Sequence, residues 1–202
     1  MSTPSLTLSY DDVVLGAELR RARKKAGVTA RELASRIGCS SSHISQLERG
    51  LSSPSVMTLF RIVTELGISV DDLFKTARSD SLAKRSEPGS EYFVRSLDHH
   101  CRVLHGGVEW EMLTPTAEDG FEFTEFTYEV GGSDGKDFLR RAGRIYGVAL
   151  SGQLGCEVGS EEFVVEAGDT VAFDSMIPHR FWNAGDVPAR TIFVWRRDVA
   201  GE

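Results

Sequence analysis

Three cysteines are the residues whose chemistry could supply a zinc site or a disulfide, and their spacing argues against both. Cys39, Cys101 and Cys156 lie far apart in the sequence, and no two of them form a Cys-x-x-Cys pair. An odd number of separated cysteines is typical of a reducing cytoplasm. We therefore interpret each cysteine as a small core residue, and we expect the protein to be cytoplasmic.

The composition of this 202-residue chain argues against a membrane partner and against export. No apolar run approaches the roughly 18 residues that a membrane span needs, and the first residues lack the basic and apolar blocks of a signal peptide. Residues 1–78 carry 11 Lys and Arg against 8 Asp and Glu, a net charge of +3, whereas residues 79–202 carry 12 against 22, a net charge of −10. A mildly basic N-terminal part, here called the head, and an acidic C-terminal part, here called the body, are typical of a protein that binds nucleic-acid phosphate through its N-terminal part only.

Two kinds of periodicity divide the chain and predict two domains, an all-α head and an all-β body. From Asp12 to Phe74 the apolar residues recur at helical spacing. From Glu91 onward, aromatic and β-branched residues come in short runs broken by glycine, which predicts many short strands in a sandwich or barrel. The expected segments are a disordered N-terminus at 1–11, the helical domain at 12–75, a polar linker at 76–90, the β-domain at 91–198 and a tail at 199–202.

Capping chemistry predicts about five helices in the head. Two short helices separated by a turn that contains glycine form a helix-turn-helix arrangement. Gly27 is predicted to end the first helix, a Thr29–Glu32 capping box to open the second, and Gly38 to close it. Ser40 is predicted to cap a third helix that runs to about Glu48. Ser55 would cap a fourth helix, and Ser69–Asp72 would open a short fifth one.

The head resembles the Xre/Cro-type, phage-repressor-like DNA-binding domain over roughly residues 15–74. The stretches that carry the resemblance are Leu15-Gly-Ala-Glu-Leu-Arg-Arg-Ala-Arg-Lys-Lys-Ala-Gly-Val-Thr29, Glu32-Leu-Ala34, Ile44-Ser-Gln-Leu-Glu-Arg-Gly50 and Pro54-Ser55. In this family the third helix lies in the major groove of DNA, with its N-terminal residues on base edges. The resemblance implies a transcription regulator, and we expect a homodimer that binds a pseudo-palindromic operator in double-stranded DNA.

Alignment with this family assigns most of the DNA contacts to the third predicted helix. Ser41, Ser42 and Gln46 would face the bases, where Gln46 can pair with adenine through two hydrogen bonds. Ser40 and His43 would lie near phosphate, and the basic run at 20–25 is either a solvated face or a source of one or two phosphate contacts. The expected DNA-binding residues are Ser40, Ser41, Ser42, His43, Gln46, Arg31 and Arg49.

A second resemblance begins at Gly168 and covers about residues 91–198. The stretch Gly168-Asp-Thr-Val-Ala-Phe-Asp-Ser-Met-Ile-Pro-His-Arg-Phe-Trp-Asn183 is similar to the second motif of the cupin superfamily. It departs from that motif at Asp174, where proline is usual, and at Met176, where glycine is usual. The resemblance implies an all-β cupin, which is a double-stranded β-helix or jelly-roll barrel with a ligand cavity in its mouth.

The residues at the cupin metal-ligand positions do not form a metal site. The family's first motif supplies two histidines and a glutamate, and counting back from Gly152 finds Leu139, Arg141 and Ile145 instead. Only His179 matches the ligand set, and a single imidazole beside a permanently protonated guanidinium does not hold a divalent cation. We therefore expect no metal and no other cofactor.

The barrel interior is instead expected to bind a small effector. Strand alternation places Arg141 and Ile145 on the inner face, and an inward Arg141 needs an internal acidic partner, trapped solvent or a ligand. Such an arginine would favour a carboxylate or another planar anion. In the alternative interpretation, the arginines at 140, 141 and 144 solvate an edge strand. The expected effector-binding residues are Arg141, His179, Ile145, Phe173, Phe181 and Tyr146.

Three functions remain open for this combination of domains. The leading hypothesis is a regulator whose cupin domain dimerises, binds an effector and modulates operator affinity. One alternative is an enzyme of the helix-turn-helix–cupin epoxidase or dioxygenase type, whose chemistry needs two histidines and one carboxylate at open metal positions. The other is a regulator whose barrel only dimerises. Because the metal ligands are missing, we expect no catalytic residues.

Overall fold

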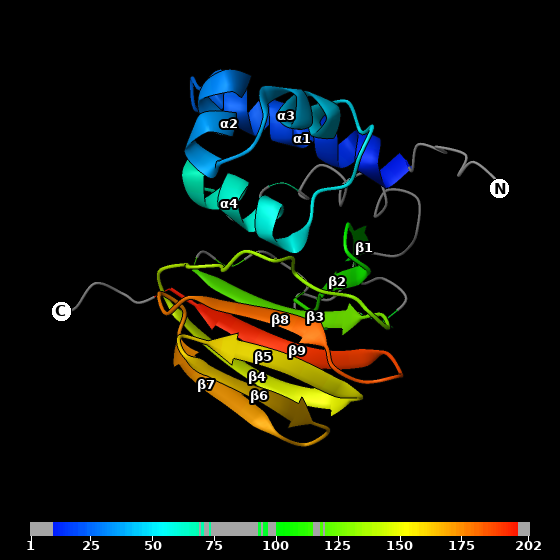
Figure 1. Ribbon diagram of the computed structural model, residues 1–202. Helices are drawn as coiled ribbons and strands as arrows, with labels where there is room; N and C mark the ends of the chain where they lie inside the picture. The colour runs from blue at the N-terminus through cyan, green and yellow to red at the C-terminus, as the bar shows by residue number, and fades with distance from the viewer. Residues whose placement is uncertain are drawn as a thin grey trace, which may run out of the picture. The chain divides into compact units, whose positions relative to one another are not determined.

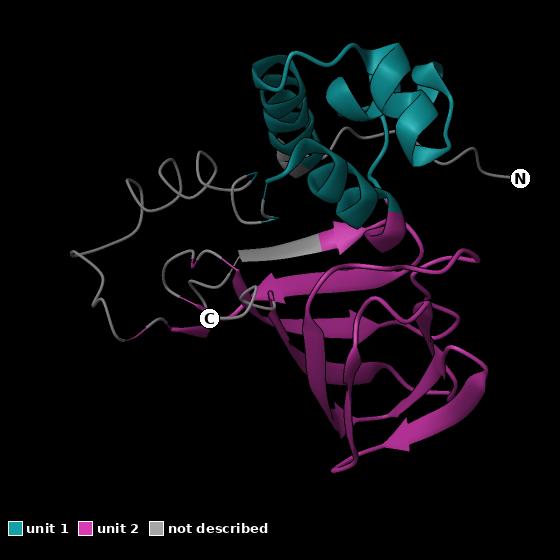
Figure 2. Ribbon diagram, turned by 90° about the vertical axis from the view of Figure 1, so that its left-hand side faces the viewer, with its two compact units in different colours: residues 1–54, 58–86 teal, residues 55–57, 87–202 magenta. Residues whose placement is uncertain are grey.

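The computed structural model describes residues 10–68, 70, 73, 93, 95–96, 100–114, 118 and 120–197. The chain divides into two compact units, one formed by residues 1–54 and 58–86 and the other by residues 55–57 and 87–202 (Figure 2). The first unit is helical and the second is built of antiparallel strands (Figure 1). The two-domain α and β fold class predicted from the sequence is confirmed.

The described part of the helical unit contains four helices, and two of them carry the predicted caps at Thr29, Gly38 and Ser40. The helices are α1 (Tyr10–Lys25), α2 (Ala30–Ile37), α3 (Ser41–Glu48) and α4 (Val56–Leu66). Thr29 and Glu32 form a reciprocal capping box at the start of α2, and Gly38 ends this helix in the left-handed conformation that glycine adopts most readily. The Ser40 hydroxyl caps α3 by accepting a hydrogen bond from the His43 amide. These confirmed caps fix the turn between α2 and α3.

The two ends of this unit differ from their predicted bounds or are described only in part. Helix α1 begins at Tyr10, so residues 10 and 11, expected to be disordered, are helical. Of the predicted fifth helix, Val70 and Leu73 are helical and buried, and the rest lies outside the described residues. The predicted linker at 76–90 and the tail at 199–202 lie outside them as well.

The helices meet at a tight core because two glycines allow close backbone contact. A Cβ atom on Gly16 of α1 would lie 2.3 Å from the Leu47 carbonyl oxygen of α3, and one on Gly50 would lie 2.6 Å from the Cα of Val13. Side chains larger than glycine would separate α1 from α3 at both points. The apolar faces bury Leu33, Ile44, Leu47, Leu59, Ile62 and Val63.

The second unit contains nine described strands in two antiparallel sheets. They are β1 (His100–Leu104), β2 (Val108–Met112), β3 (Phe121–Tyr128), β4 (Arg144–Ser151), β5 (Gln153–Val158), β6 (Glu161–Glu166), β7 (Thr170–Asp174), β8 (His179–Asn183) and β9 (Ala189–Arg196). The larger sheet has the order β1-β2-β3-β9-β4-β7 and the smaller one β6-β5-β8. The inner faces of the two sheets form the core of the barrel (Figure 2).

The register between strands decides which side chains share the interior. Glu122 of β3 pairs with Trp195 of β9, Trp195 pairs with Ile145 of β4, and Ile145 pairs with Phe173 of β7. These four residues therefore form one row across the inner face of the larger sheet. The side chains that alternate with them point to the outer face. Arg141 and His179, which were predicted to lie in the interior, are at the end of the barrel where this row of residues lies.

Candidate DNA-reading helix and barrel interior

Helix α3 presents a polar face beside a buried apolar one. Ile44 and Leu47 are 1% and 2% exposed, and they fasten the helix to the core of the head. Ser41, Ser42 and Gln46 are exposed on the helix, and His43 is half-buried. Because α3 is only eight residues long, the hydroxyl groups of its first turn lie within one turn of the Gln46 amide. This is the arrangement expected of a helix that reads base edges.

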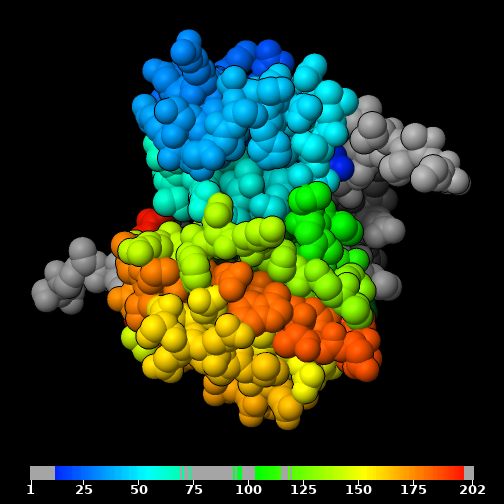
Figure 3. Space-filling view, viewed as in Figure 1, coloured from blue at the N-terminus to red at the C-terminus, as the bar shows by residue number. Residues whose placement is uncertain are grey.

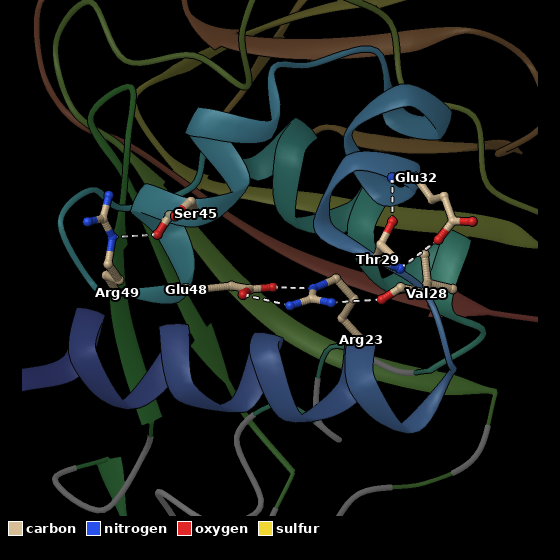
Figure 4. Close-up of polar contacts among 7 residues, drawn as sticks. All are labelled: Arg23, Val28, Thr29, Glu32, Ser45, Glu48 and Arg49. Atoms are coloured by element: carbon tan, nitrogen blue, oxygen red, sulfur yellow. Dashed lines mark hydrogen bonds and ion pairs between the residues drawn. The ribbon is translucent and has the colours of Figure 1, made fainter.

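The two arginines expected to contact DNA differ in their freedom. Arg31 is exposed on α2. Arg49 is exposed just after α3, and its Nε donates a hydrogen bond of 3.0 Å to the Ser45 carbonyl oxygen (Figure 4). The Arg49 side chain therefore lies back along the last turn of α3, at the opposite end from the Ser40 cap.

The basic run on α1 includes residues with a structural role. Arg23 forms a two-pronged ion pair with Glu48 of α3 at 2.5 and 3.0 Å and also donates to the Val28 carbonyl oxygen (Figure 4). Arg21 forms an ion pair with Glu18 on the same helix. The Glu48 pair, which is largely buried, ties α1 to α3 and raises the pKa of Arg23. Arg23 therefore positions α3 and is not part of a solvated face.

Arg141 lies inside the barrel with an internal acidic partner. Its two terminal nitrogens donate to the two Glu122 carboxylate oxygens, each at 2.6 Å, and its guanidinium carbon lies 3.3 Å from the centroid of the Trp195 ring. The side chains of Arg141 and Glu122 are only 10% and 5% exposed. An inward arginine was predicted to need an internal acidic partner, trapped solvent or a ligand. The structure contains the acidic partner, the carboxylate of Glu122.

A short segment beside β8 carries Arg141 to this position. Leu139 and His179 exchange two backbone hydrogen bonds, and the Asp134 amide donates to the Phe181 carbonyl oxygen. The Arg141 amide then donates to the Ser175 carbonyl oxygen, and the Ser175 hydroxyl donates back to the Arg141 carbonyl oxygen. The segment from 134 to 141 thus follows β8 and is anchored at both ends.

His179 is the most deeply buried residue of the expected effector site, at 1% exposed. Its Nδ1 lies 2.9 Å from the Ile177 carbonyl oxygen, so Nδ1 carries the proton and Nε2 is an acceptor. Within the described residues Nε2 has no hydrogen-bond partner. Burial lowers the pKa of His179, which keeps the ring neutral. A buried acceptor without a partner is energetically unfavourable and would gain from a ligand that donates a hydrogen bond.

Aromatic rings fill the space around His179. Phe173 and Phe181 have ring centroids 5.0 and 5.9 Å from the imidazole, and Phe181 lies 4.8 Å from Phe193. Ile145 is half-buried in the same row as Phe173. Figure 3 shows one face of the barrel, on which side chains fill the gaps between the strands drawn in Figure 1. The imidazole of His179 is therefore packed against aromatic rings in the barrel interior.

Tyr146 does not lie with the other expected effector residues. It follows Ile145 on β4, so alternation turns it to the outer face of the sheet, where it is 40% exposed. Arg144 lies over its ring, with its guanidinium carbon 5.8 Å from the ring centroid. Tyr146 therefore does not share the barrel interior with the other expected effector residues, because adjacent residues of a strand cannot share a face.

Glu122, the partner of Arg141, was not among the residues predicted from the sequence. The run Phe121-Glu-Phe-Thr-Glu-Phe-Thr-Tyr128 alternates, and hydrophobicity alone would turn Phe121 and Phe123 inward. The structure instead turns Glu122 and Thr124 inward with Phe126 and Tyr128. The signal that could have indicated this face is the pair Phe126 and Tyr128, which are on the same face of the strand as Glu122.

A second buried polar cluster, also missed from the sequence, contains Asp134. The Tyr128 hydroxyl donates to Asp134 Oδ1 at 2.9 Å, and the Phe181 amide donates to Oδ2 at 3.2 Å. Asn183 is next along β8 on this face and donates to the Tyr128 and Val187 carbonyl oxygens. Burial raises the pKa of Asp134 to about 7, against the opposing effect of the two hydrogen bonds.

The described residues contain no group of three or more histidine, cysteine or acidic side chains that is arranged to hold a metal ion. The positions of the cupin ligands are occupied as the alignment indicated, with Leu139 buried, Arg141 paired to Glu122, and Ile145 beside Trp195. In the described part of the chain, no helix has the length and apolar character to cross a membrane.

Comparison with known proteins assigns both units. A helix-turn-helix family model matches residues 19–73, and a cupin domain model matches residues 124–195. The HTH-type transcriptional regulator PuuR of Escherichia coli is 24% identical over 179 residues, which cover 87% of this chain and 91% of the relative. The uncharacterized HTH-type transcriptional regulator y4dJ of Sinorhizobium fredii is 38% identical over 56 residues, which cover 28% of this chain and 73% of the relative.

A solved structure shares the whole architecture. The HTH_3 family transcriptional regulator from Vibrio cholerae superposes with a TM-score of 0.68 at 22% sequence identity, covering 92% of this chain and 96% of that one. Fold and site together define a protein that joins an Xre-like helix-turn-helix domain to a cupin barrel. The chain belongs to the HTH-type transcriptional regulators.

Proposed function

We propose that the protein is a one-component regulator that binds a pseudo-palindromic operator as a homodimer in the cytoplasm. The observation that carries this proposal is the exposed polar face of α3, where Ser41, Ser42 and Gln46 stand opposite the buried Ile44 and Leu47. Recognition helices of a dimer lie about one turn of B-DNA apart, roughly 34 Å, which explains why operators of this class are symmetric.

Replacing Gln46 by alanine should weaken operator binding by ~1–3 kcal/mol, about 5- to 150-fold, because one bidentate base contact is lost. Affinity for random DNA should change little. Genomic fragments selected by binding supply the operator, and fluorescence anisotropy at fixed salt measures both affinities. Gln153→Ala, the same substitution on β5 of the barrel, is the matched control. Equal losses on operator and random DNA would show that Gln46 does not read bases.

We further propose that the barrel binds a small effector beside His179 and thereby modulates operator affinity. Nε2 of His179 supports this site: it has no hydrogen-bond partner in the described part of the chain, so a ligand that donates to it relieves a buried unsatisfied acceptor. An anionic group that took the place of Glu122 would bind both terminal nitrogens of Arg141. Such an exchange would reorganise the interior, and reorganisation is how ligand binding can be coupled to DNA binding.

A thermal-shift screen against metabolites tests the effector site, because a ligand that binds only the native state stabilises it by ~2.7 kcal/mol at 100 times its Kd. At least one compound should raise the unfolding midpoint and change operator affinity by about 5- to 150-fold. His179→Phe keeps a ring between Phe173 and Phe181 but removes Nε2, so this variant should lose the response. Val164→Thr, on an exposed position of β6, should keep it. A full response in His179→Phe would place the effector elsewhere.

A further inference from the structure

The two ends of the barrel interior differ in their access to solvent. Phe173, which contacts His179, is 9% exposed, and its inward-facing neighbour Ile145 is only half-buried. Val108 and Ala189, which face the interior in the row at the opposite end, are 0% exposed. The end that contains His179 is therefore the one that water and small solutes can reach.

The charged side chains in this interior compensate one another. Arg141 and Glu122 form a pair that has no net charge. The other buried carboxyl of the described barrel is Asp134, whose oxygens accept from the Tyr128 hydroxyl and the Phe181 amide. Burial raises the pKa of Asp134 to about 7, so this carboxyl keeps its proton in weakly acidic solution. An ion brought into the interior would therefore lose its hydration without gaining a counter-charge, which is costly in apolar surroundings.

Two uncharged polar atoms at the His179 end have no hydrogen-bond partner among the described residues. They are the acceptor Nε2 of His179 and the donor Nε1 of Trp195. The imidazole is neutral, with its proton on Nδ1 beside the Ile177 carbonyl oxygen. The rings of Phe173 and Phe181 pack against it. The hydrogen-bonding capacity left in this part of the interior is thus neutral and lies in apolar surroundings.

We propose that the effector of the barrel is an uncharged hydroxyl compound with an apolar body, and that its hydroxyl group donates to Nε2 of His179. This inference rests on the effector site proposed above and adds the chemical class of its ligand. A hydroxyl group both donates and accepts, so it suits an interior that offers one acceptor and one donor. The apolar body packs against Phe173 and Phe181, and the burial of apolar surface contributes to affinity. A carboxylate that displaced Glu122 would only exchange one ion pair for another and leave the Glu122 charge unpaired.

Three probes that share one skeleton and differ in charge test this class. They are benzyl alcohol, benzoate and benzylammonium, each titrated against the full-length chain at about pH 6, where both ions keep their charge. Saturation-transfer NMR measures the three dissociation constants. Benzyl alcohol should bind at least about 10-fold more tightly than either ion, because each ion loses its hydration without meeting a counter-charge.

Variants of the interior connect this binding to named atoms. His179→Phe should weaken the binding of benzyl alcohol by about 2- to 10-fold, the range for one neutral hydrogen bond. His179→Gln keeps both an N–H for the Ile177 carbonyl oxygen and an acceptor oxygen, so it should restore the affinity. Glu122→Gln removes the negative charge beside Arg141, so it should bind benzoate at least about 10-fold more tightly than the wild type does. Circular dichroism checks that each variant is folded, and Val164→Thr on the exposed part of β6 is the matched control.

The outcomes separate the class of ligand from the effector site itself. Tighter binding of benzoate or benzylammonium than of benzyl alcohol to the wild type, still weakened in His179→Phe, would overturn the uncharged class and leave the site standing. Benzyl alcohol that binds His179→Phe as tightly as the wild type would overturn both the class and the site. If none of the three probes binds the wild type, the present inference fails, and the metabolite screen decides the effector site independently.

Discussion

Replacing Glu122 by alanine should destabilise the barrel by about 3–5 kcal/mol, because the substitution leaves the Arg141 guanidinium in the interior without its carboxylate. The two side chains are nearly inaccessible to water, and their two 2.6 Å hydrogen bonds have the geometry of a strong bidentate pair. The stacked Trp195 ring would remain, yet it does not replace the lost negative charge. All three tryptophans of the chain lie in barrel strands, so tryptophan fluorescence during urea unfolding reports this unit.

Two further variants determine whether the loss comes from the unpaired charge. Glu157→Ala removes a partly exposed ion pair with Arg180 on the smaller sheet and should cost less than about 1 kcal/mol. Replacing both members of the interior pair, by Glu122→Leu and Arg141→Met, should recover most of the stability, since apolar substitutes for a buried pair are often neutral or stabilising. If Glu122→Ala costs no more than Glu157→Ala, Arg141 does not depend on Glu122.

The bounds of α2 and α3 in the head could be predicted from the sequence, because interactions between residues close in the chain determine where these helices begin and end. The capping box at Thr29, the left-handed Gly38 and the serine cap at Ser40 each act within a few residues, so their spacing in the sequence is enough to predict them. The same is true of the division between the buried face of α3, with Ile44 and Leu47, and its exposed polar face. These predictions needed no knowledge of distant parts of the chain.

The ion pair between Arg23 and Glu48 could not be predicted from interactions between residues that are close in the sequence. Its two residues are 25 positions apart and meet only because α1 packs on α3. From the sequence, Arg23 is one of five basic residues in a run and nothing distinguishes it from its neighbours. The close approach of the two helices at Gly16 brings them together, and that approach depends on the tertiary fold.

The barrel interior was predicted in part, and the errors there also have tertiary causes. Arg141, His179, Phe173 and Phe181 lie inside as alternation and the cupin resemblance indicated. Tyr146 was placed inside although it neighbours Ile145, and Glu122 was missed because two phenylalanines flank it. A charged residue belongs inside a barrel only when its partner arrives from another strand. Sequence periodicity contains no information about that partner.

Asp134 should make the stability of the barrel fall as pH rises from about 4 to about 7. Burial raises the pKa of this carboxyl from 3.8 to about 7, so across this window the native state keeps a proton that the unfolded chain has released. The contribution is fully present below the unfolded pKa and is lost as pH passes the folded pKa. By the conversion of 1.36 kcal/mol per pKa unit, the change is roughly 4 kcal/mol.

Neighbouring groups set the design of this measurement. Burial raises the pKa of Tyr128 well above its usual value, so its hydroxyl remains a donor to Asp134 throughout the window, and burial raises the pKa of Cys156 to about 12, so its thiol stays neutral. His179 acts in the opposite direction. Its pKa is lowered by burial, so acid favours the unfolded chain below the usual pKa of histidine. The raw pH profile of the wild type therefore contains both effects.

The comparison of wild type with Asp134→Asn isolates the carboxyl, because both proteins contain His179. The amide oxygen can accept from the Phe181 amide as Oδ2 does, and the side chain stays neutral at every pH. Relative to wild type, the Asn variant should therefore gain stability steadily between pH 4 and 7 and be the more stable protein at pH 8. Urea unfolding monitored by tryptophan fluorescence measures this difference, with Asp186→Asn in an exposed loop as the matched control. A difference between Asp134→Asn and wild type that does not vary with pH would mean that Asp134 is ionised throughout, held as a carboxylate by Tyr128 and the Phe181 amide.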